Sequence, residues 1–214
     1  MQMSRADFEQ RYAENNLRIA FVGMSNIGKS YIGSRLAKAF DFDLIQVDQL
    51  IWESLGQSSM ADFAEWQGQP YSDGYAEREA RSIALESEAT AAALRSSLKN
   101  AILDTTGSVI YTQKSVQEKL LNDWFIVHIS ASEGDLERLR GQYFKNPKPL
   151  IWNGHYVRNP SQTMDEAILT SYPTLLTSRA KAYASMADTT LRSDIIFNPD
   201  YSTEDIFEAL KPAV

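Results

Sequence analysis

The sequence predicts an α/β fold in which a parallel sheet of about five strands lies between two layers of helices. Two observations lead to this prediction. Short apolar runs of strand length alternate along the chain with longer segments of helical periodicity. A loop of the pattern G-x-x-x-x-G-K-[ST], residues 23–30, lies between the first apolar run and the first helix. Together they indicate the three-layer P-loop NTPase architecture, as a single domain over residues 1–214.

The loop itself follows the apolar strand 17–22 and precedes a helix with an apolar face. Gly23 and Gly28 permit backbone angles that other residues avoid, so successive N–H groups can face inward and bind phosphate at a helix N-terminus. Lys29 supplies an ammonium for the γ-phosphate, and the Ser30 hydroxyl is placed to ligate Mg²⁺. We expect ATP or GTP to contact the residues Gly23, Ser25, Asn26, Ile27, Gly28, Lys29, Ser30 and Tyr31.

The other elements of the first half follow in order. Residues 1–16 are expected to form a short amphipathic helix, an accessory that packs beside the domain. A second apolar strand, 44–47, ends at Asp48, which opens a helix. The stretch 58–97 is mostly helical and leads into the strand 101–104. This order of strands and helices is typical of a parallel sheet.

In the second half, a helix, a β-branched and aromatic strand and a further helix are predicted over residues 116–121, 124–129 and 136–144. Residues 145–163, here called the lid segment, combine proline, aromatic and basic residues without periodicity, which is typical of a movable surface loop. A helix containing Arg179 follows, then a strand at 195–197. The closing helix is capped near Ser202.

Two carboxylates stand where a phosphoryl-transfer site needs them. Asp48 and Asp104 each follow an apolar strand, and the carboxyl ends of parallel strands meet at one edge of a sheet. Either could hold Mg²⁺ together with Ser30. Asp48 could also orient an acceptor hydroxyl and receive its proton, which makes Lys29 and Asp48 the candidate catalytic residues. The structural alternative is that both acids are helix N-caps.

Composition limits the partners. The net charge of −7 and a pI near 4.9 disfavour nucleic acid or an anionic membrane as the main partner. The chain has no Cys, and its two His are too few for a His-rich metal site. No apolar run approaches the roughly 20 residues that cross a bilayer, and no signal-peptide pattern opens the sequence. We expect a cytoplasmic protein, without a prediction of its oligomeric state.

The motif order resembles a known family. The segments 28–33 (GKSYIG) and 47–53 (VDQLIWE) are similar to the P-loop and the following strand-end Asp of the shikimate kinase family, with Tyr31 in place of Thr. Further segments resemble the family's Gly-Phe-Arg-x-x-Glu segment, glycine-rich turn, lid Arg-Pro-Leu and Arg-x-x-x-Tyr helix, at residues 74–79, 105–109, 148–150 and 179–183. The similarity spans roughly residues 17–210.

This resemblance implies a small kinase that transfers the γ-phosphoryl group of ATP to a hydroxyl of a small molecule beneath a closing lid. Carried across by position, it implies that Asp48 contacts the acceptor hydroxyl and that Arg179 binds an acceptor anion. Gly107 lies in the turn that borders the acceptor. It further implies that Arg140 stacks on adenine and that Lys148 reaches the phosphates.

The chain also departs from the family's pattern. Ala76 stands where the family has an Arg that grips the shikimate carboxylate, and a methyl group cannot replace a bidentate anion clamp. Arg78 lies about 200° further around the helix and does not substitute for it. Thr105 and Thr106 alter the glycine-rich turn. We therefore expect an acceptor other than shikimate.

The sequence predicts an ATP- and Mg²⁺-dependent kinase that acts on a small polar metabolite through a hydroxyl group. One alternative is a nucleoside or nucleotide kinase, although the lid segment is poor in the Arg residues that such enzymes use. The other is a nucleotide-binding regulatory protein that has lost phosphoryl transfer. The joint presence of Lys29, Ser30, Asp48 and Asp104 favours active chemistry.

Overall fold

The computed structural model describes residues 3–56, 59–96, 99–132, 134–145 and 149–213. Within these ranges, five parallel strands form one sheet in the order β2-β3-β1-β4-β5. The strands are β1 (Arg18–Val22), β2 (Asp43–Gln46), β3 (Ala101–Asp104), β4 (Phe125–Ser130) and β5 (Thr189–Arg192). The predicted α/β class and the parallel sheet are confirmed.

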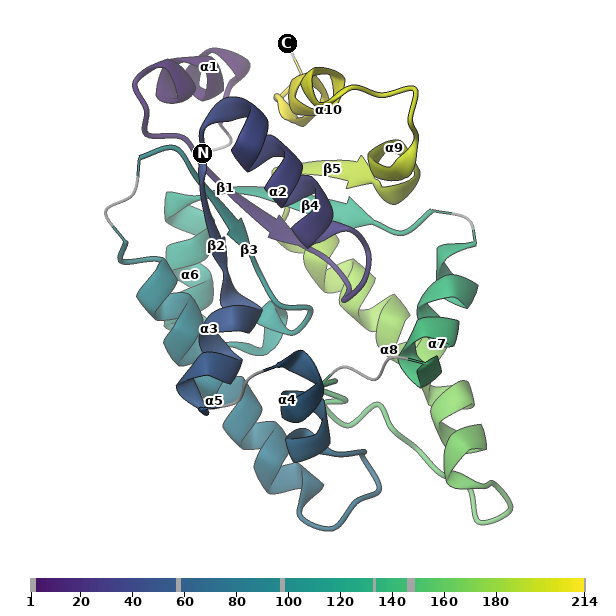
Figure 1. Ribbon diagram of the computed structural model, residues 1–214. Coiled ribbons are helices and arrows are strands. Elements are labelled where there is room, and N and C mark those ends of the chain that lie inside the picture. The colour runs from purple at the N-terminus through teal and green to yellow at the C-terminus, as the bar shows by residue number, and fades with distance from the viewer. Residues whose placement is uncertain (1–2, 57–58, 97–98, 133, 146–148, 214) are drawn as a thin grey trace.

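Helices cover both faces of the sheet, so the molecule has three layers (Figure 1). Helix α2 crosses the front of the sheet beside α10, whereas α6 and α8 lie behind it. The helices of the described chain are α1 (Arg5–Ala13), α2 (Lys29–Phe40), α3 (Val47–Ser54), α4 (Met60–Gln67), α5 (Tyr75–Ala93), α6 (Lys114–Asp123), α7 (Asp135–Lys145), α8 (Met164–Met186), α9 (Ser193–Phe197) and α10 (Thr203–Leu210), with one 3₁₀ turn, η1 (Val109–Tyr111).

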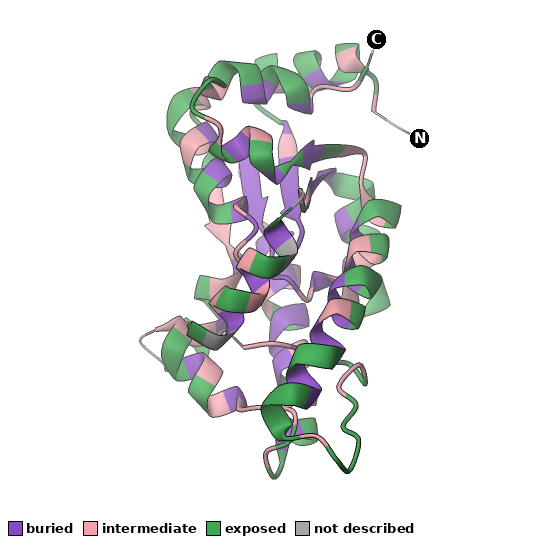
Figure 2. Cartoon of the chain, turned by 90° about the vertical axis from the view of Figure 1, so that its right-hand side faces the viewer, coloured by how far each residue is buried: buried purple, intermediate pink, exposed green. Residues whose placement is uncertain are grey.

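The central strands β1, β3 and β4 are buried almost completely, as the sheet in Figure 2 shows. Both of their faces are covered by helices, which explains why they read as continuous apolar runs instead of alternating ones. Phe21 of β1 is in register with Asp104 of β3, and Asp104 is in register with Gln46 of β2. The three strands therefore end at the same edge, where their following loops meet.

The accessory helix predicted for residues 1–16 is α1. Phe8 is fully buried and contacts Phe125 of β4 and Phe207 of α10, with ring centroids 5.2 and 5.8 Å apart. Tyr12 stacks on Phe42 at 5.6 Å. Helix α1 is thus joined to the sheet and to α10 through one aromatic cluster.

The predicted strand at 195–197 was wrong. These residues belong to the short helix α9, and the edge strand is β5, immediately before it. A three-residue apolar run is too short for its periodicity to distinguish a strand from a helix. In the structure Ile196 is buried while Phe197 is half exposed, so the run does not lie in the sheet. Strand β5 pairs with β4 from Thr189 to Arg192.

Candidate active site

The P-loop connects β1 to α2 at the carboxyl edge of the sheet. Gly23 has a φ of 149°, and a Cβ there would lie 2.8 Å from the backbone oxygen of Ile129. Gly28, the residue before α2, has a φ of 117°. Both values lie in the region that favours glycine, which explains these two positions of the motif.

Lys29 lies at the first position of α2 and is 6% exposed. Its Nζ donates hydrogen bonds to the backbone oxygens of Gly23 and Met24, at 3.0 and 2.9 Å. The ammonium group is therefore held across the loop that the motif predicts to bind phosphate. Ser30, the next residue, is exposed.

A cleft opens above this loop, and we call it the P-loop cleft. Its lining includes Ser25, Lys29, Ser30, Asp48, Asp104 and Arg138. Asp104 is the last residue of β3 and is 6% exposed, whereas Asp48 is the second residue of α3 and is half buried. Gln46 occupies the N-cap position of α3, and Asp104 precedes no helix directly. The N-cap alternative therefore does not account for either acid.

These side chains fit a magnesium ion. Ser30, Asp48 and Asp104 bring one hydroxyl and two carboxylates to the same cleft. Mg²⁺ prefers such oxygen ligands and is commonly held by one or two carboxylates together with phosphates and waters. Among the described residues no group of three or more His, Cys, Asp and Glu is arranged to hold a metal. The donor set suits an ion that is shared with a phosphate.

Arg138 lines this cleft together with Lys29. Arg140 pairs with Glu137 at 2.6 Å and is absent from the described lining of the cleft. Arg138 donates from Nη1 to the backbone oxygen of Asn26 in the P-loop, at 2.9 Å. Residues two apart on a helix face roughly opposite directions, so only one of the two can reach the loop.

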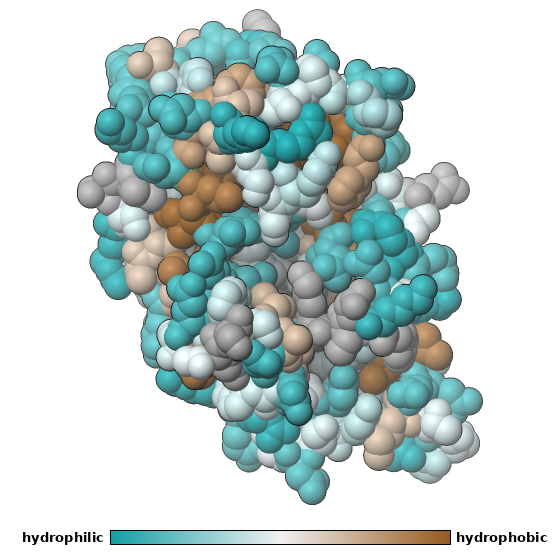
Figure 3. Space-filling model, viewed as in Figure 1, coloured by the Kyte–Doolittle hydropathy of each residue, from teal (hydrophilic) through white to brown (hydrophobic). Residues whose placement is uncertain are grey.

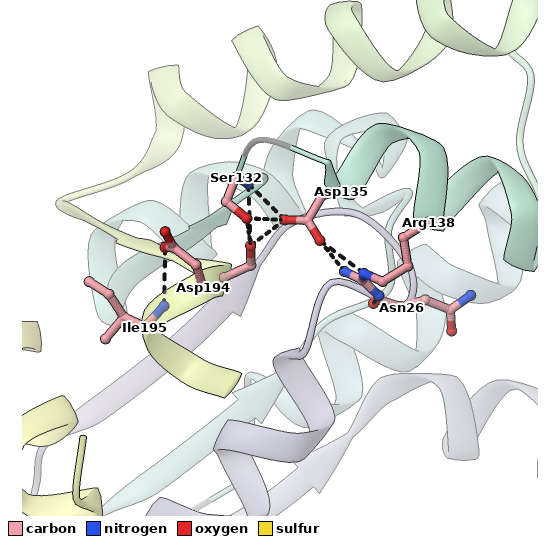
Figure 4. Close-up of polar contacts among 7 residues, drawn as sticks. Asn26, Ser132, Asp135, Arg138, Asp194 and Ile195 are labelled. Carbon is pink, nitrogen blue, oxygen red and sulfur yellow. Dashed lines mark hydrogen bonds and ion pairs between the residues drawn. The ribbon is translucent and has the colours of Figure 1, made fainter. Parts of the chain in front are cut away.

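Asp135 holds Arg138 in place (Figure 4). Its Oδ1 accepts a hydrogen bond from Arg138 Nε at 2.9 Å, and its Oδ2 accepts bonds from the Ser132 backbone and hydroxyl and from the Ser193 hydroxyl. Burial acts to raise the pKa of Asp135, but these hydrogen bonds outweigh burial and lower the pKa to about 2. The network joins the P-loop, α7 and the start of α9.

Two aromatic rings lie beside the P-loop cleft. Tyr31 and Phe197 stack with centroids 5.4 Å apart and are 49% and 50% exposed. The guanidinium carbon of Arg138 lies 5.7 Å from the centre of the Phe197 ring. Hydrophobic surface is visible beside α9 in Figure 3. This side of the cleft offers a flat, apolar surface.

A second cavity, the inner pocket, lies between α3, α4, α5 and the turn after β3. Its lining includes Ser25, Asp48, Ser82, Glu86, Gly107 and Arg179. Ser25 and Asp48 line the P-loop cleft as well, so the two cavities adjoin. A Cβ at Gly107 would lie 2.9 Å from Ser25 Oγ and 3.3 Å from Arg179 Nη1. A side chain at position 107 would crowd Ser25 and Arg179, which favours glycine where this turn passes the P-loop.

Arg179 is 2% exposed, so its guanidinium lies inside the protein and not on the surface. Its guanidinium donates to the backbone oxygens of Gly107 and Ile151, at 2.8 and 2.6 Å. Nε has no hydrogen-bond partner in the described part of the chain. Tyr183, one helical turn later, also donates to the oxygen of Gly107. Arg179 thus supports the turn and borders the inner pocket at the same time.

Glu86 is the pocket residue that sequence reasoning missed. It lies on α5, is 3% exposed, and accepts hydrogen bonds from the hydroxyls of Thr106 and Ser108. A signal was present, because Glu86 continues the spacing of Tyr75, Ser82 and the other buried residues of α5. A carboxylate on the buried stripe of an amphipathic helix needs a polar reason to be there.

Lys145, the first residue of the lid segment, is the last residue of α7, and residues 149–163 have no regular structure but are partly packed. Trp152 is 2% exposed, so it is not available to a substrate as a loop aromatic would be. Glu79 Oε1 accepts from the backbone N–H groups of Trp152 and Asn153, at 2.5 and 3.0 Å. The predicted phosphate contact Lys148 lies outside the described residues.

The fold is similar to that of solved shikimate kinase structures. The shikimate kinase from Acinetobacter baumannii in complex with shikimate is 20% identical with a TM-score of 0.62, and the match covers 92% of each chain. The shikimate kinase from Aquifex aeolicus vf5 is 19% identical with a TM-score of 0.58, covering 91% of this chain and 96% of that one. At these identities the likeness shows the fold alone.

No curated protein sequence matches this chain. The family model described as shikimate kinase matches residues 25–210, which include the P-loop from Ser25 onward, the inner pocket and α10. A match over this much of the chain shows that the protein belongs to the shikimate kinase family.

Proposed function

We propose that this protein is an ATP- and Mg²⁺-dependent kinase that phosphorylates a hydroxyl group of a small polar metabolite bound at Asp48, where the inner pocket adjoins the P-loop cleft. The observation that carries the proposal is the position of Asp48. It lines both the P-loop cleft and the inner pocket, so one carboxylate faces the place for the triphosphate and the place for the acceptor. Family membership supports small-molecule kinase chemistry.

The residues would divide the reaction as follows. Asp48 orients the acceptor hydroxyl and takes its proton as the hydroxyl oxygen forms a bond to the γ-phosphorus and the bond to the ADP oxygen breaks. The amides of the P-loop and Lys29 stabilise the charge on the phosphate oxygens. Mg²⁺, held by Ser30, Asp104 and Asp48, would supply further charge neutralisation. Most of the catalysis is therefore positioning and electrostatics.

The nucleotide base belongs, on this proposal, against the aromatic side of the P-loop cleft. Tyr31 and Phe197 present stacked, half-exposed rings there, and Arg138 is fixed beside Phe197 by Asp135. A purine stacks favourably on aromatic rings and on a guanidinium plane. Arg138 thus takes the role that the family resemblance had implied for Arg140.

Shikimate is not the acceptor that this pocket favours. Ala76, which stands in place of the family's carboxylate-binding Arg, is exposed and is absent from the described lining of the inner pocket. Arg78 does not replace that Arg, because its Nε donates to the backbone oxygen of Gln67 at 2.9 Å. The described pocket therefore lacks a second arginine for a carboxylate clamp.

The test is acceptor-stimulated release of ADP, measured with polyols, sugars, hydroxy acids, nucleosides and nucleoside monophosphates. We expect at least one non-nucleoside acceptor to stimulate ATP consumption. Lys29→Ala should lower the stimulated rate by at least about 100-fold and leave the fold intact, because a transition-state charge partner is lost. Lys38→Ala, at the far end of α2, is the matched control and should retain the rate.

Three results would count against this function. A Lys29→Ala protein of normal activity removes the P-loop from the reaction. Stimulation by nucleosides or nucleoside monophosphates alone favours the nucleotide-kinase alternative, and binding of ATP without stimulation by any acceptor favours a regulatory protein.

A further inference from the structure

The buried carboxylate of Glu86 is arranged as a binding group of the inner pocket. Thr106 and Ser108 donate their hydroxyl hydrogens to its two oxygens, one to each. The Ser108 backbone N–H donates to Thr106 Oγ1 at 3.0 Å, which leaves the hydroxyl hydrogen of Thr106 available for Glu86. A carboxylate has about four lone-pair sites, and the two hydroxyls use two of them. Acceptor capacity therefore remains on a group that lines the pocket.

Burial of Glu86 demands a functional or structural reason, and ion pairing in the described protein does not supply one. Burial raises its pKa to about 7, against the lowering effect of the two hydroxyl bonds; the charge of Asp48 also raises the pKa, and that of Arg179 lowers it. No described salt bridge includes Glu86. A hydrogen-bond donor brought by a ligand would complete its environment.

The charges around the inner pocket point to the same kind of ligand. Its described lining contains two carboxylates, Asp48 and Glu86, and one cation, Arg179. The guanidinium of Arg179 is already bound to two backbone oxygens. An acceptor with its own carboxylate would meet like charges on Asp48 and Glu86, whereas a hydroxyl or an ammonium group would meet a hydrogen-bond acceptor.

We propose that Glu86 is a specificity-determining residue that accepts a hydrogen bond from a hydroxyl or ammonium group of the acceptor, so that the substrate is a neutral or amine-bearing polyol and not a polyhydroxy acid. The inference rests on the proposed function, because it names the substrate class of the same pocket. Gln67 and Ser82, two other polar residues of the lining, are bound to each other, and Gln67 also donates to the Leu150 oxygen. Glu86 is thus the buried carboxylate of the pocket that favours a hydrogen-bond donor over an anion.

The experiment uses two matched probe series on the full chain. The linear series is glucitol, glucamine and gluconate, and the cyclic series is inositol, an aminocyclitol and shikimate. Both kcat and KM are measured by ADP release, and binding of each probe is measured separately by calorimetry. The variant is Glu86→Gln, which keeps the size of the side chain and lets the Thr106 and Ser108 hydroxyls turn to suit an amide. Glu88→Gln is the control, since Glu88 lies on the same helix and pairs with Arg81 at the surface.

In the wild type we expect the neutral or amine-bearing member of a series to exceed the carboxylate in kcat/KM by tenfold or more. Glu86→Gln should lower kcat/KM for the amine at least tenfold, mainly through KM, and for the neutral polyol less. The value for the carboxylate should stay the same or rise. Glu88→Gln should match the wild type. A higher kcat/KM for the amine would identify an ammonium group as the donor to Glu86, and a higher value for the neutral polyol would identify a hydroxyl.

Three results would overturn the inference: preference for the carboxylates, an equal change for all members in Glu86→Gln, or no binding of any probe. Their meaning differs from a failure of the kinase function. If the amine binds in a Glu86-dependent way but ATP is not consumed, the pocket specificity stands and the kinase proposal fails. If ATP is consumed with a carboxylate acceptor only, the kinase proposal stands and the specificity fails.

Discussion

Three carboxylates near the two cavities have different surroundings, and the differences define their roles. Asp48 is half buried where the P-loop cleft and the inner pocket adjoin. Glu86 is buried behind it with hydroxyl donors, and burial raises its pKa. Asp135 lies on the other side of the P-loop, where hydrogen bonds overcome burial and lower its pKa. On the proposals above, Asp48 reacts, Glu86 binds the acceptor and Asp135 positions Arg138, and the environment of each carboxylate, more than its residue type, separates these roles.

Asp135 gives a prediction with a defined pH dependence. Its pKa in the folded protein, about 2, lies below the ordinary 3.8, so its charge contributes stability above about pH 4 that is lost as the pH falls toward 2. Asp135→Asn should lower the free energy of unfolding by about 1 kcal/mol at pH 7, because charge-assisted hydrogen bonds are weakened. Urea denaturation at several pH values measures this.

The control is Asp194→Asn, which removes an exposed ion pair with Arg192 and should leave stability unchanged. The deficit of Asp135→Asn should shrink between pH 4 and pH 2.5. A deficit that is the same at pH 7 and pH 2.5 would show that the charge of Asp135 does not stabilise the fold.

The residues that the motif names could be predicted from the sequence, and the rest of the site needed the tertiary structure. Lys29, Asp48 and Asp104 all line the P-loop cleft, as their positions after strands indicated. Arg138 and Glu86 were not predicted. Arg138 reaches the P-loop and Arg140 does not, because the two side chains leave α7 in different directions. Glu86 becomes a pocket residue because α5 packs against the turn after β3. Local spacing places Glu86 on the buried side of α5, but it does not encode which turn that side meets.

At the scale of elements, the lid segment is tied to α5 and α8 through its backbone. Tyr75 donates to the Leu150 oxygen at 2.7 Å, Arg179 donates to the Ile151 oxygen, and Glu79 accepts from two backbone N–H groups. Pro149 and Ile151 of this segment thus line the inner pocket, although composition alone indicated a surface loop. The proline and aromatic content of the lid segment does not reveal which helix side chains will form hydrogen bonds with its backbone.

Glu79→Ala tests this anchoring. Loss of the carboxylate removes the acceptor of the Trp152 and Asn153 amides, and hydrogen bonds to a charged group are worth about 1.5–3 kcal/mol. We expect hydrogen exchange at these two amides to accelerate by at least about tenfold, measured by NMR or by mass spectrometry. Glu77→Ala, exposed in the first turn of α5, should not change it. Unchanged exchange in Glu79→Ala would mean that the anchor lies elsewhere.

At the scale of the whole molecule, the sheet order brings the P-loop and Asp104 together, because β1 and β3 are adjacent and end in register. The sequence predicted four of the five strands within one or two residues and misplaced the fifth, at 195–197. The buried central strands have long apolar runs, whereas β5 reads Thr-Thr-Leu-Arg at the edge and carries a weak signal. No helix in the described chain has the length and apolarity that a membrane span requires.

Helix α1 is an integral part of this molecule if its aromatic contacts stabilise the sheet. Phe8→Ala removes a fully buried ring from contact with Phe125 and Phe207, and such changes cost about 3–5 kcal/mol. Chemical denaturation should show a loss in this range, whereas Gln10→Ala on the exposed face should have little effect. A loss below about 1 kcal/mol would make α1 a dispensable attachment.

The central claim is that the loop between β1 and α2 binds the phosphates of ATP with Mg²⁺. Calorimetric titration of the protein with Mg²⁺ and ATP tests it most directly. We predict saturable binding at one site per chain, and at least tenfold weaker binding in a folded Lys29→Ala variant. An absence of binding heat in the folded wild type at several temperatures, or equal affinity in both proteins, would contradict the account.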